Sequence, residues 1–121
     1  MPVVKTHLLT GRSVDEKRAI GDAVQTALFD VLEIPSEAIF HVFAEYSEEN
    51  FGHNLGEPYP SQQLLFIELS FFEGEGRDDD TKNALFRAIN ANLVAKDIIH
   101  TEDLFIVITE VPRANMGAGS A

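Results

Sequence analysis

The sequence contains an internal repeat. Residues 11–52 align with residues 76–117 at a constant offset of 65 positions, without a gap, and 14 of the 42 aligned positions are identical. Unrelated segments of ordinary composition would match at only about two or three such positions. The identical pairs are Gly11/Gly76, Arg12/Arg77, Asp15/Asp80, Lys17/Lys82, Ala19/Ala84, Ala23/Ala88, Leu28/Leu93, Ile34/Ile99, Glu37/Glu102, Phe40/Phe105, Val42/Val107, Glu45/Glu110, Asn50/Asn115 and Gly52/Gly117. We therefore expect the chain to fold as a duplicated structural unit.

Each repeat has the pattern of a strand, a helix and a second strand. In the first repeat an apolar run ends at Gly11, and Ser13 and Glu16 then have the spacing of a capping box at a helix start. Apolar residues follow at helical spacing until Pro35 ends the helix. In the second repeat, Asp78 or Asp79 is expected to cap a helix that runs to about residue 94. The predicted strands cover residues 3–9, 39–44, 64–72 and 104–109.

Two such units predict an α+β fold. Strands joined through a helix run parallel, so we expect a duplicated β-α-β unit that forms a four-stranded mixed sheet with two helices on one face. A single domain is expected over residues 1–121, with pseudo-repeats at 2–52 and 64–119 and a connection at 53–63. Apolar residues also crowd the other sheet face, and a chain of this length has no third layer to cover it. Self-association through that face is therefore expected.

Charge and composition exclude several classes of function. The chain has 20 acidic and 9 basic residues, and its formal net charge is −11. Binding to nucleic acid or to an anionic membrane needs clustered Lys and Arg, so neither partner is expected. The absence of Cys excludes disulfides and thiolate metal sites. No apolar run reaches transmembrane length and no signal-peptide pattern is visible, so we expect a cytoplasmic protein.

Pro2 is the first candidate for chemistry. Methionine aminopeptidases generally remove Met1 when proline follows, and the new terminus would be a secondary amine. A free α-amino group titrates at roughly 7.7–8.0, and burial at the start of a strand would lower its pKa toward the pH at which a general base works best. The alternative is an ordinary start in which Pro2 only rigidifies the entry to the strand. If Met1 stays attached, the Pro2 nitrogen is an amide and has no basicity.

Arg12 and Arg77 occupy equivalent positions in the two repeats, at the turn between strand and helix. A guanidinium there, beside free helix amides, is suited to bidentate binding of a carboxylate. The alternative is a surface arginine that pairs with Asp15 or Asp80. We expect Arg77, with Arg12 second, to anchor the carboxylate.

Further candidates lie near the ends of the repeats. Glu110, like its counterpart Glu45, ends a return strand and could activate water, although an exposed strand-end carboxylate fits as well. Phe51 and Met116 are equivalent apolar residues that fit a pocket wall or the core. The four His residues lack metal-binding spacing, so no metal site is expected.

Taken together, these residues resemble the tautomerase superfamily, whose members work with an amino-terminal proline. The stretch 2–13 is similar to the opening of the 4-oxalocrotonate tautomerases, as are Lys17 and the closing stretch 108–119. The resemblance covers nearly the whole chain outside 53–63. Long members of the superfamily fuse two β-α-β units and form trimers, so the resemblance implies a homotrimer.

The resemblance also implies roles for individual residues. Pro2 would be the general base, Arg77 and Arg12 would hold the substrate carboxylate, and Phe51 and Met116 would form pocket walls. The implied substrate is a small 2-keto or enol carboxylic acid, with no cofactor.

The chain departs from several branches of the superfamily. The short tautomerases have an Arg on the return strand, where Phe40 and Phe105 stand here. The decarboxylase branch has an Asp at the position of Ala38, and the dehalogenase branch has a His at Phe29 and an Arg at Gly74. Simple proton transfer needs the fewest of these groups, so a tautomerase is the prediction.

Two alternatives remain open. One is a hydratase, dehalogenase or decarboxylase that uses the same Pro2, with Glu110 to activate water. The other is a noncatalytic trimeric binding module. A retained Met1 would favour the binding module.

Overall fold

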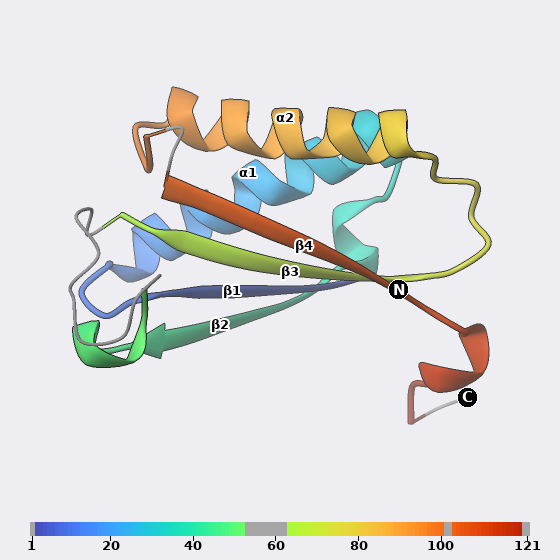
Figure 1. Cartoon of the computed structure of the whole chain (residues 1–121), viewed down its shortest axis with the longest axis horizontal. Helices are drawn as coiled ribbons and strands as arrows, with labels where there is room; N and C mark the ends of the chain where they lie inside the picture. The colour runs from blue at the N-terminus through green and yellow to red at the C-terminus, as the bar shows by residue number, and fades with distance from the viewer. Residues whose placement is uncertain (1, 53–62, 101–102, 120–121) are drawn as a thin grey trace.

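The computed structural model describes residues 2–52, 63–100 and 103–119. These residues form one four-stranded sheet with two helices across one of its faces (Figure 1). In chain order the elements are β1 (Val3–Leu9), α1 (Val14–Leu32), β2 (Phe40–Tyr46), β3 (Leu65–Phe72), α2 (Asp79–Ala95) and β4 (Leu104–Val111), with short 3₁₀ turns at Ser36–Ala38, Glu48–Asn50 and Arg113–Asn115. The predicted mixed sheet with both helices on one face is confirmed. The predicted connection 53–63 lies outside the described residues except for Gln63.

The strand order is β2-β1-β3-β4. β1 pairs in parallel with β2, and β3 pairs in parallel with β4, as expected for two β-α-β units. The two units meet through the antiparallel pair of β1 and β3, in which Val3 lies opposite Ser70 and Leu8 lies opposite Leu65. The start of β1 therefore lies beside the end of β3, at the same end of the sheet where β4 ends (Figure 1). The candidate site lies at this end of the sheet.

Local sequence signals explain where the helices begin and end. The Ser13 side chain accepts a hydrogen bond from the Glu16 amide, and the Glu16 side chain accepts one from the Ser13 amide, so the predicted capping box is confirmed. Asp78, rather than Asp79, caps α2 by accepting from the amide of Thr81. α1 ends at Leu32, and its C-cap residue Glu33 takes a left-handed conformation with φ of 57°. No helix in the described part of the chain is long and apolar enough to cross a membrane.

The core lies between the helices and the sheet. Alternate residues of β1 and β3, such as Leu8 and Leu65, contact the apolar faces of α1 and α2, and the core side chains are almost fully buried. Burial of each large aliphatic side chain contributes about 1.5–3 kcal/mol before the entropy of ordering is subtracted. The two helices are also joined directly, because the Asn92 side chain donates a hydrogen bond to the carbonyl of Ala23 at 3.0 Å.

The face of the sheet opposite the helices is open in the single chain. Phe40 is 57% exposed and Phe105 is 56% exposed on this outer face, one on each edge strand. A polar cluster lies at its centre, where the His7 ring contacts the Tyr46 hydroxyl at 2.6 Å and Glu68 Oε2 at 2.5 Å. Exposed aromatic residues around a satisfied polar centre are typical of a surface that is covered by a partner.

Candidate active site

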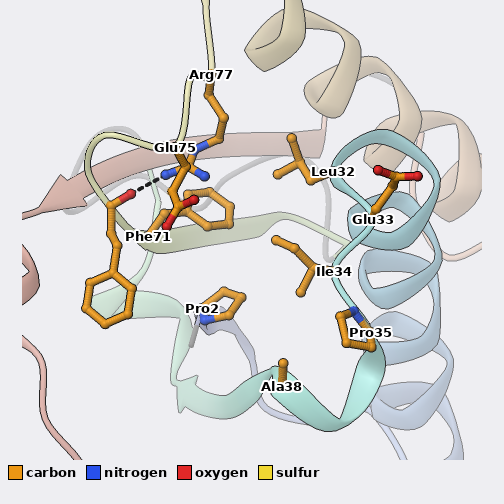
Figure 2. A pocket seen from close by; sticks show the side chains of 10 residues that line it. Pro2, Leu32, Glu33, Ile34, Pro35, Ala38, Phe71, Glu75 and Arg77 are labelled. Atoms are coloured by element: carbon orange, nitrogen blue, oxygen red, sulfur yellow. Dashed lines mark hydrogen bonds between the residues drawn. The ribbon is translucent and has the colours of Figure 1, made fainter.

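Pro2 and Arg77 line one cavity, although 75 positions separate them in the sequence. The antiparallel pairing of β1 and β3 brings the start of β1 next to the end of β3, and Arg77 follows β3 in the turn before α2. The cavity has a volume of about 340 Å³. Figure 2 shows Pro2 on one side, Arg77 and Glu75 on another, and residues from the end of α1 opposite them. Pro2 is buried in the chain.

The Arg77 side chain is only 8% exposed. One of its terminal nitrogens donates to the backbone carbonyl of Phe72 and to Glu110 Oε2, the latter at 3.3 Å. The guanidinium lies over the ring of Phe71, at 4.6 Å from the ring centroid. Its buried Nε has no hydrogen-bond partner among the described residues. A buried guanidinium at a cavity wall is suited to bind a carboxylate, because charge-assisted hydrogen bonds to a carboxylate are among the strong ones.

Glu110 is held by two cations. Its carboxylate accepts from Lys82 Nζ at 2.6 Å and from Arg77 on its other oxygen. The hydrogen bond from Lys82, together with the positive charges of Lys82 and Arg77, outweighs partial burial and lowers the pKa of Glu110. A carboxylate with a lowered pKa is a weaker base. Glu110 contacts Arg77 but is not among the residues that line the Pro2 cavity, so its role in water activation stays a prediction.

The structure places Arg12 at the opposite end of β1 from Pro2. Its side chain is 12% exposed and donates to the carbonyls of Ile98 at 3.0 Å and Gln63 at 3.3 Å. The pair of Lys17 and Glu45 at this end repeats the pair of Lys82 and Glu110, with an N–O distance of 2.7 Å. The duplication has thus produced two similar ends. Only one of them contains Pro2, because the strand that starts at the Arg12 end is β3 and the strand that starts at the Arg77 end is β1.

Phe51 and Met116 are likewise separated. The Phe51 ring stacks on Tyr46 with centroids 5.3 Å apart and borders a hollow at the Arg12 end, together with Phe66 and Phe105. Met116 borders a hollow next to the Pro2 cavity. Of the two predicted wall residues, only Met116 lies at the Pro2 end of the same chain.

Sequence reasoning missed two residues of the site. Phe72 borders both the Pro2 cavity and the hollow beside Met116, and Glu75 lines the Pro2 cavity. Glu75 forms an ion pair with Arg113, whose guanidinium also lies over the Phe72 ring at 4.9 Å from its centroid. The only signal for these contacts was the position of both residues at the end of the strand that Arg77 follows. In the described part of the chain, no three acidic or His side chains converge on a metal site.

Comparison with known proteins shows the family to which the chain belongs. Two models of tautomerase enzymes match the chain, one over residues 2–54 and the other over residues 56–119. The chain belongs to the tautomerase family, as a member with a duplicated unit. The first match begins at Pro2 and the second covers the unit that contains Arg77.

Individual relatives differ in their stated activities. The chain is 24% identical, over 89% of its length and 85% of the relative, to a protein of Bacillus subtilis (strain 168) described as probable tautomerase YusQ. It is 29% identical to a malonate semialdehyde decarboxylase (FG41) inhibited by 3-bromopropiolate, with a TM-score of 0.81 and coverage of 97% and 88% of the two chains. A fused 4-OT that forms an asymmetric trimer shares the fold at 22% identity, with a TM-score of 0.81 and coverage of 98% and 94%.

Proposed function

We propose that the chain is a cofactor-independent tautomerase of small 2-oxo or enol carboxylic acids, with the Pro2 amine as general base after removal of Met1. The observation that carries this proposal is the cavity in which buried Pro2 faces Arg77, a buried arginine whose Nε has no partner among the described residues. Pro2 and Arg77 of one chain thus line the same cavity, which is what a base and a carboxylate anchor for such a reaction require.

In the proposed reaction the substrate carboxylate binds the Arg77 guanidinium, and the carbon next to the oxo group lies against the Pro2 nitrogen. The nitrogen removes a proton from that carbon, and the electron pair moves to the carbonyl oxygen to form the enolate. The protonated Pro2 then returns the proton to oxygen or carbon, so no atom is gained or lost. General base catalysis of this kind contributes about 10²- to 10⁴-fold.

The surroundings favour an uncharged Pro2 amine at neutral pH. Phe71, Phe72 and Ile34 line the cavity and lower its polarity. Burial disfavours the charged form of an amine, and the nearby positive charge of Arg77 does the same. Glu33 and Glu75 line the same cavity and favour the charged form, although Glu75 is paired with Arg113. We expect burial and Arg77 to have the larger effect, so that the pKa of a free Pro2 nitrogen is lowered. Exclusion of water by a bound substrate would strengthen the attraction between Arg77 and a developing enolate.

The experiment that tests this function uses the natively processed chain, with Met1 removal checked by intact mass. We expect it to catalyse ketonisation of phenylenolpyruvate and exchange of the C3 protons of pyruvate in D₂O, followed by ultraviolet absorbance and proton NMR. Rates no higher than the buffer background for both substrates would refute the proposal.

Decarboxylation is the second candidate, favoured by the 29% identity to a malonate semialdehyde decarboxylase. The position at which the resemblance implies an acidic residue in that branch is Ala38, and Ala38 lines the Pro2 cavity. We therefore expect CO₂ release from malonate semialdehyde to be slower than ketonisation. A decarboxylation kcat/KM above that for the enol acid would make the second candidate the function.

The role of Glu110 gives a separate prediction. Glu110→Gln should raise KM for the acid several-fold, because Arg77 loses a contact that orients it, and should change kcat by less than about tenfold. Since the pKa of Glu110 is lowered by folding, its ionic contribution to stability is complete above the ordinary carboxyl value of 4.5 and is lost as the pH falls through the folded value. The variant should therefore lose less stability than the wild type on acidification. Hydration of a haloacrylate by the wild type that is lost in Glu110→Gln would instead assign Glu110 to water activation.

We also propose that the chain assembles as a homotrimer through the outer face of its sheet. This rests on the exposed Phe40, Phe105 and Val107 side chains of that face and on the trimers described for fused 4-OT structures. Sedimentation equilibrium should give three times the chain mass, and Val107→Glu should shift it toward the monomer, because a charge buried without a partner is costly. A wild-type chain that sediments as a monomer at micromolar concentration would contradict this.

A further inference from the structure

The two edges of the sheet carry equivalent grooves. β2 and β4 are the edge strands, and each has one neighbouring strand in the described part of the chain (Figure 1). One groove lies between α1 and β2, and its lining includes Gly21 and Asp22. The other lies between α2 and β4, and its lining includes Phe86 and Arg87. The repeat offset of 65 positions relates these residues pairwise, so the two grooves are the same place in the two repeats.

The corresponding residues of the two grooves differ in charge. Asp22 and Arg87 are both exposed, and neither forms an ion pair with any residue that the structure describes. Lys17 and Arg18, which also line the groove at β2, already lie at 2.7 Å and 3.9 Å from carboxylate oxygens. Among the residues that line the groove at β4, Arg87 is the charged one. One edge therefore presents an unpaired negative charge and the other an unpaired positive charge.

The two edges also differ in size next to these charges. A Cβ atom added at Gly21 would lie 3.9 Å from the rings of His41 and Phe43, so this groove has room for a further side chain. The counterpart of Gly21 is Phe86, which is partly exposed. A space beside an acidic residue thus corresponds to an aromatic ring beside a basic residue. Such grooves are complementary to each other in shape and in charge, but neither is complementary to a copy of itself.

A ring of three chains with two different edges can be closed in two ways. If every chain joins its β2 edge to the β4 edge of the next chain, the ring is symmetric and all contacts are alike. If one chain is reversed, one contact joins two β2 edges and another joins two β4 edges. Among the fused 4-OT structures with this fold, some are described as asymmetric trimers and another as a symmetric trimer. The fold alone therefore leaves the order of the edges open.

We propose, on the basis of the proposed homotrimer, that Asp22 and Arg87 select the symmetric order. Asp22 of one copy faces Arg87 of the next, and the Phe86 ring of that copy lies against Gly21. A reversed chain would oppose Asp22 to Asp22 and Arg87 to Arg87, and like charges across an interface are unfavourable. Phe105, an exposed residue of the outer face, also lines the groove at β4, so this contact continues the proposed trimer interface. The assignment is independent of the proposed reaction.

The first experiment uses the absence of Cys from the chain. Thr26→Cys and Ala91→Cys place a thiol at exposed, equivalent positions one helical turn beyond Asp22 and Arg87, so both charges are kept. Each variant alone, and the two co-expressed, are treated with a flexible bismaleimide and separated by denaturing electrophoresis. We expect cross-linked dimers from the co-expressed chains and none from either variant alone.

Three outcomes of this experiment would contradict the proposals in different ways. Cross-linking within either single variant would show that like edges meet and would overturn the symmetric order. A trimer whose co-expressed chains do not cross-link would overturn the contact between the edges. A wild-type chain that sediments as a monomer would refute the proposed homotrimer itself, and the order of its edges with it.

The second experiment exchanges the charges. Arg87→Asp and Asp22→Arg should each raise the chain concentration at half-assembly by about tenfold or more, because each opposes like charges, whereas the double variant should return to within about threefold of wild type. Asp30→Arg, an exposed position of α1 outside the groove, is the matched control and should stay within about threefold. Sedimentation gives the concentrations, and circular dichroism verifies folding. A double variant that assembles no better than the single variants, or single variants that assemble like the wild type, would overturn the role of this pair.

Discussion

A chain with one extra alanine before Pro2 should lose ketonisation activity by about 100-fold or more. The addition leaves the Pro2 ring in place but converts its nitrogen into an amide, which has no basicity. General base catalysis accelerates proton transfer by about 10²- to 10⁴-fold, so loss of the amine should lower the rate by a factor of that size. The measurement is kcat/KM for phenylenolpyruvate, with intact mass to verify both termini and circular dichroism to verify folding.

The matched variant for this experiment is Pro2→Ala, which keeps a free amine after Met1 is removed but loses the rigid ring. We expect a smaller loss than with the extra alanine, about 10-fold to 100-fold, because a primary amine at a less constrained terminus is positioned less well. Equal rates in wild type, Pro2→Ala and the extended chain would remove Pro2 from the mechanism.

Arg77→Ala should lower kcat/KM by about 100-fold or more, with much of the effect in KM. The substitution removes the cation that lines the Pro2 cavity, and charge-assisted hydrogen bonds to a carboxylate in a buried site are among the strongest polar contacts. The measurement is the concentration dependence of C3 exchange for a 2-oxo acid and for the matching uncharged amide. The amide should be turned over equally by wild type and variant.

Arg12→Ala is the matched control, because Arg12 occupies the same position in the other repeat and is buried to a similar extent. We expect its kcat/KM to stay within about threefold of wild type. Its stability should fall by about 1–3 kcal/mol, because the carbonyl of Ile98 loses its arginine donor. If Arg12→Ala abolished activity in an intact assembly while Arg77→Ala did not, the active site would have to be placed at the other end of the sheet.

Elements governed by local chemistry were predictable from the sequence. The capping box of Ser13 and Glu16 needs only residues three positions apart, and the span of β1 follows from an apolar run bounded by Gly11. The ends of the two edge strands, β2 and β4, were predicted less accurately. β2 runs from Phe40 to Tyr46 rather than over 39–44, and β4 continues to Val111 because its pairing with β3 extends to Phe72. Such ends depend on a partner strand that is distant in the sequence.

The choice between Arg12 and Arg77 was similarly beyond the sequence. Both arginines follow a strand and precede a helix, so their local environments are alike. The difference arises from the antiparallel register of β1 and β3, which brings the turn after β3 to the start of β1 and leaves Arg12 at the far end. The same register places Phe72 between the Pro2 cavity and the hollow. A repeat in the sequence predicts two equivalent ends, and only the pairing of the repeats shows which end contains Pro2.

The most direct measurement is a titration of the Pro2 nitrogen itself. A processed chain labelled with ¹⁵N at proline would be followed by NMR across pH 4 to 10 (roughly the range that spans the titration of a free terminal amine). A ¹⁵N chemical shift whose titration midpoint lies below the pKa of roughly 7.7–8.0 of an exposed α-amino group would show a shielded amine that is uncharged at physiological pH. A nitrogen that shows no titration, as an amide would, or one that titrates at or above that range, would contradict the assignment of Pro2 as the base.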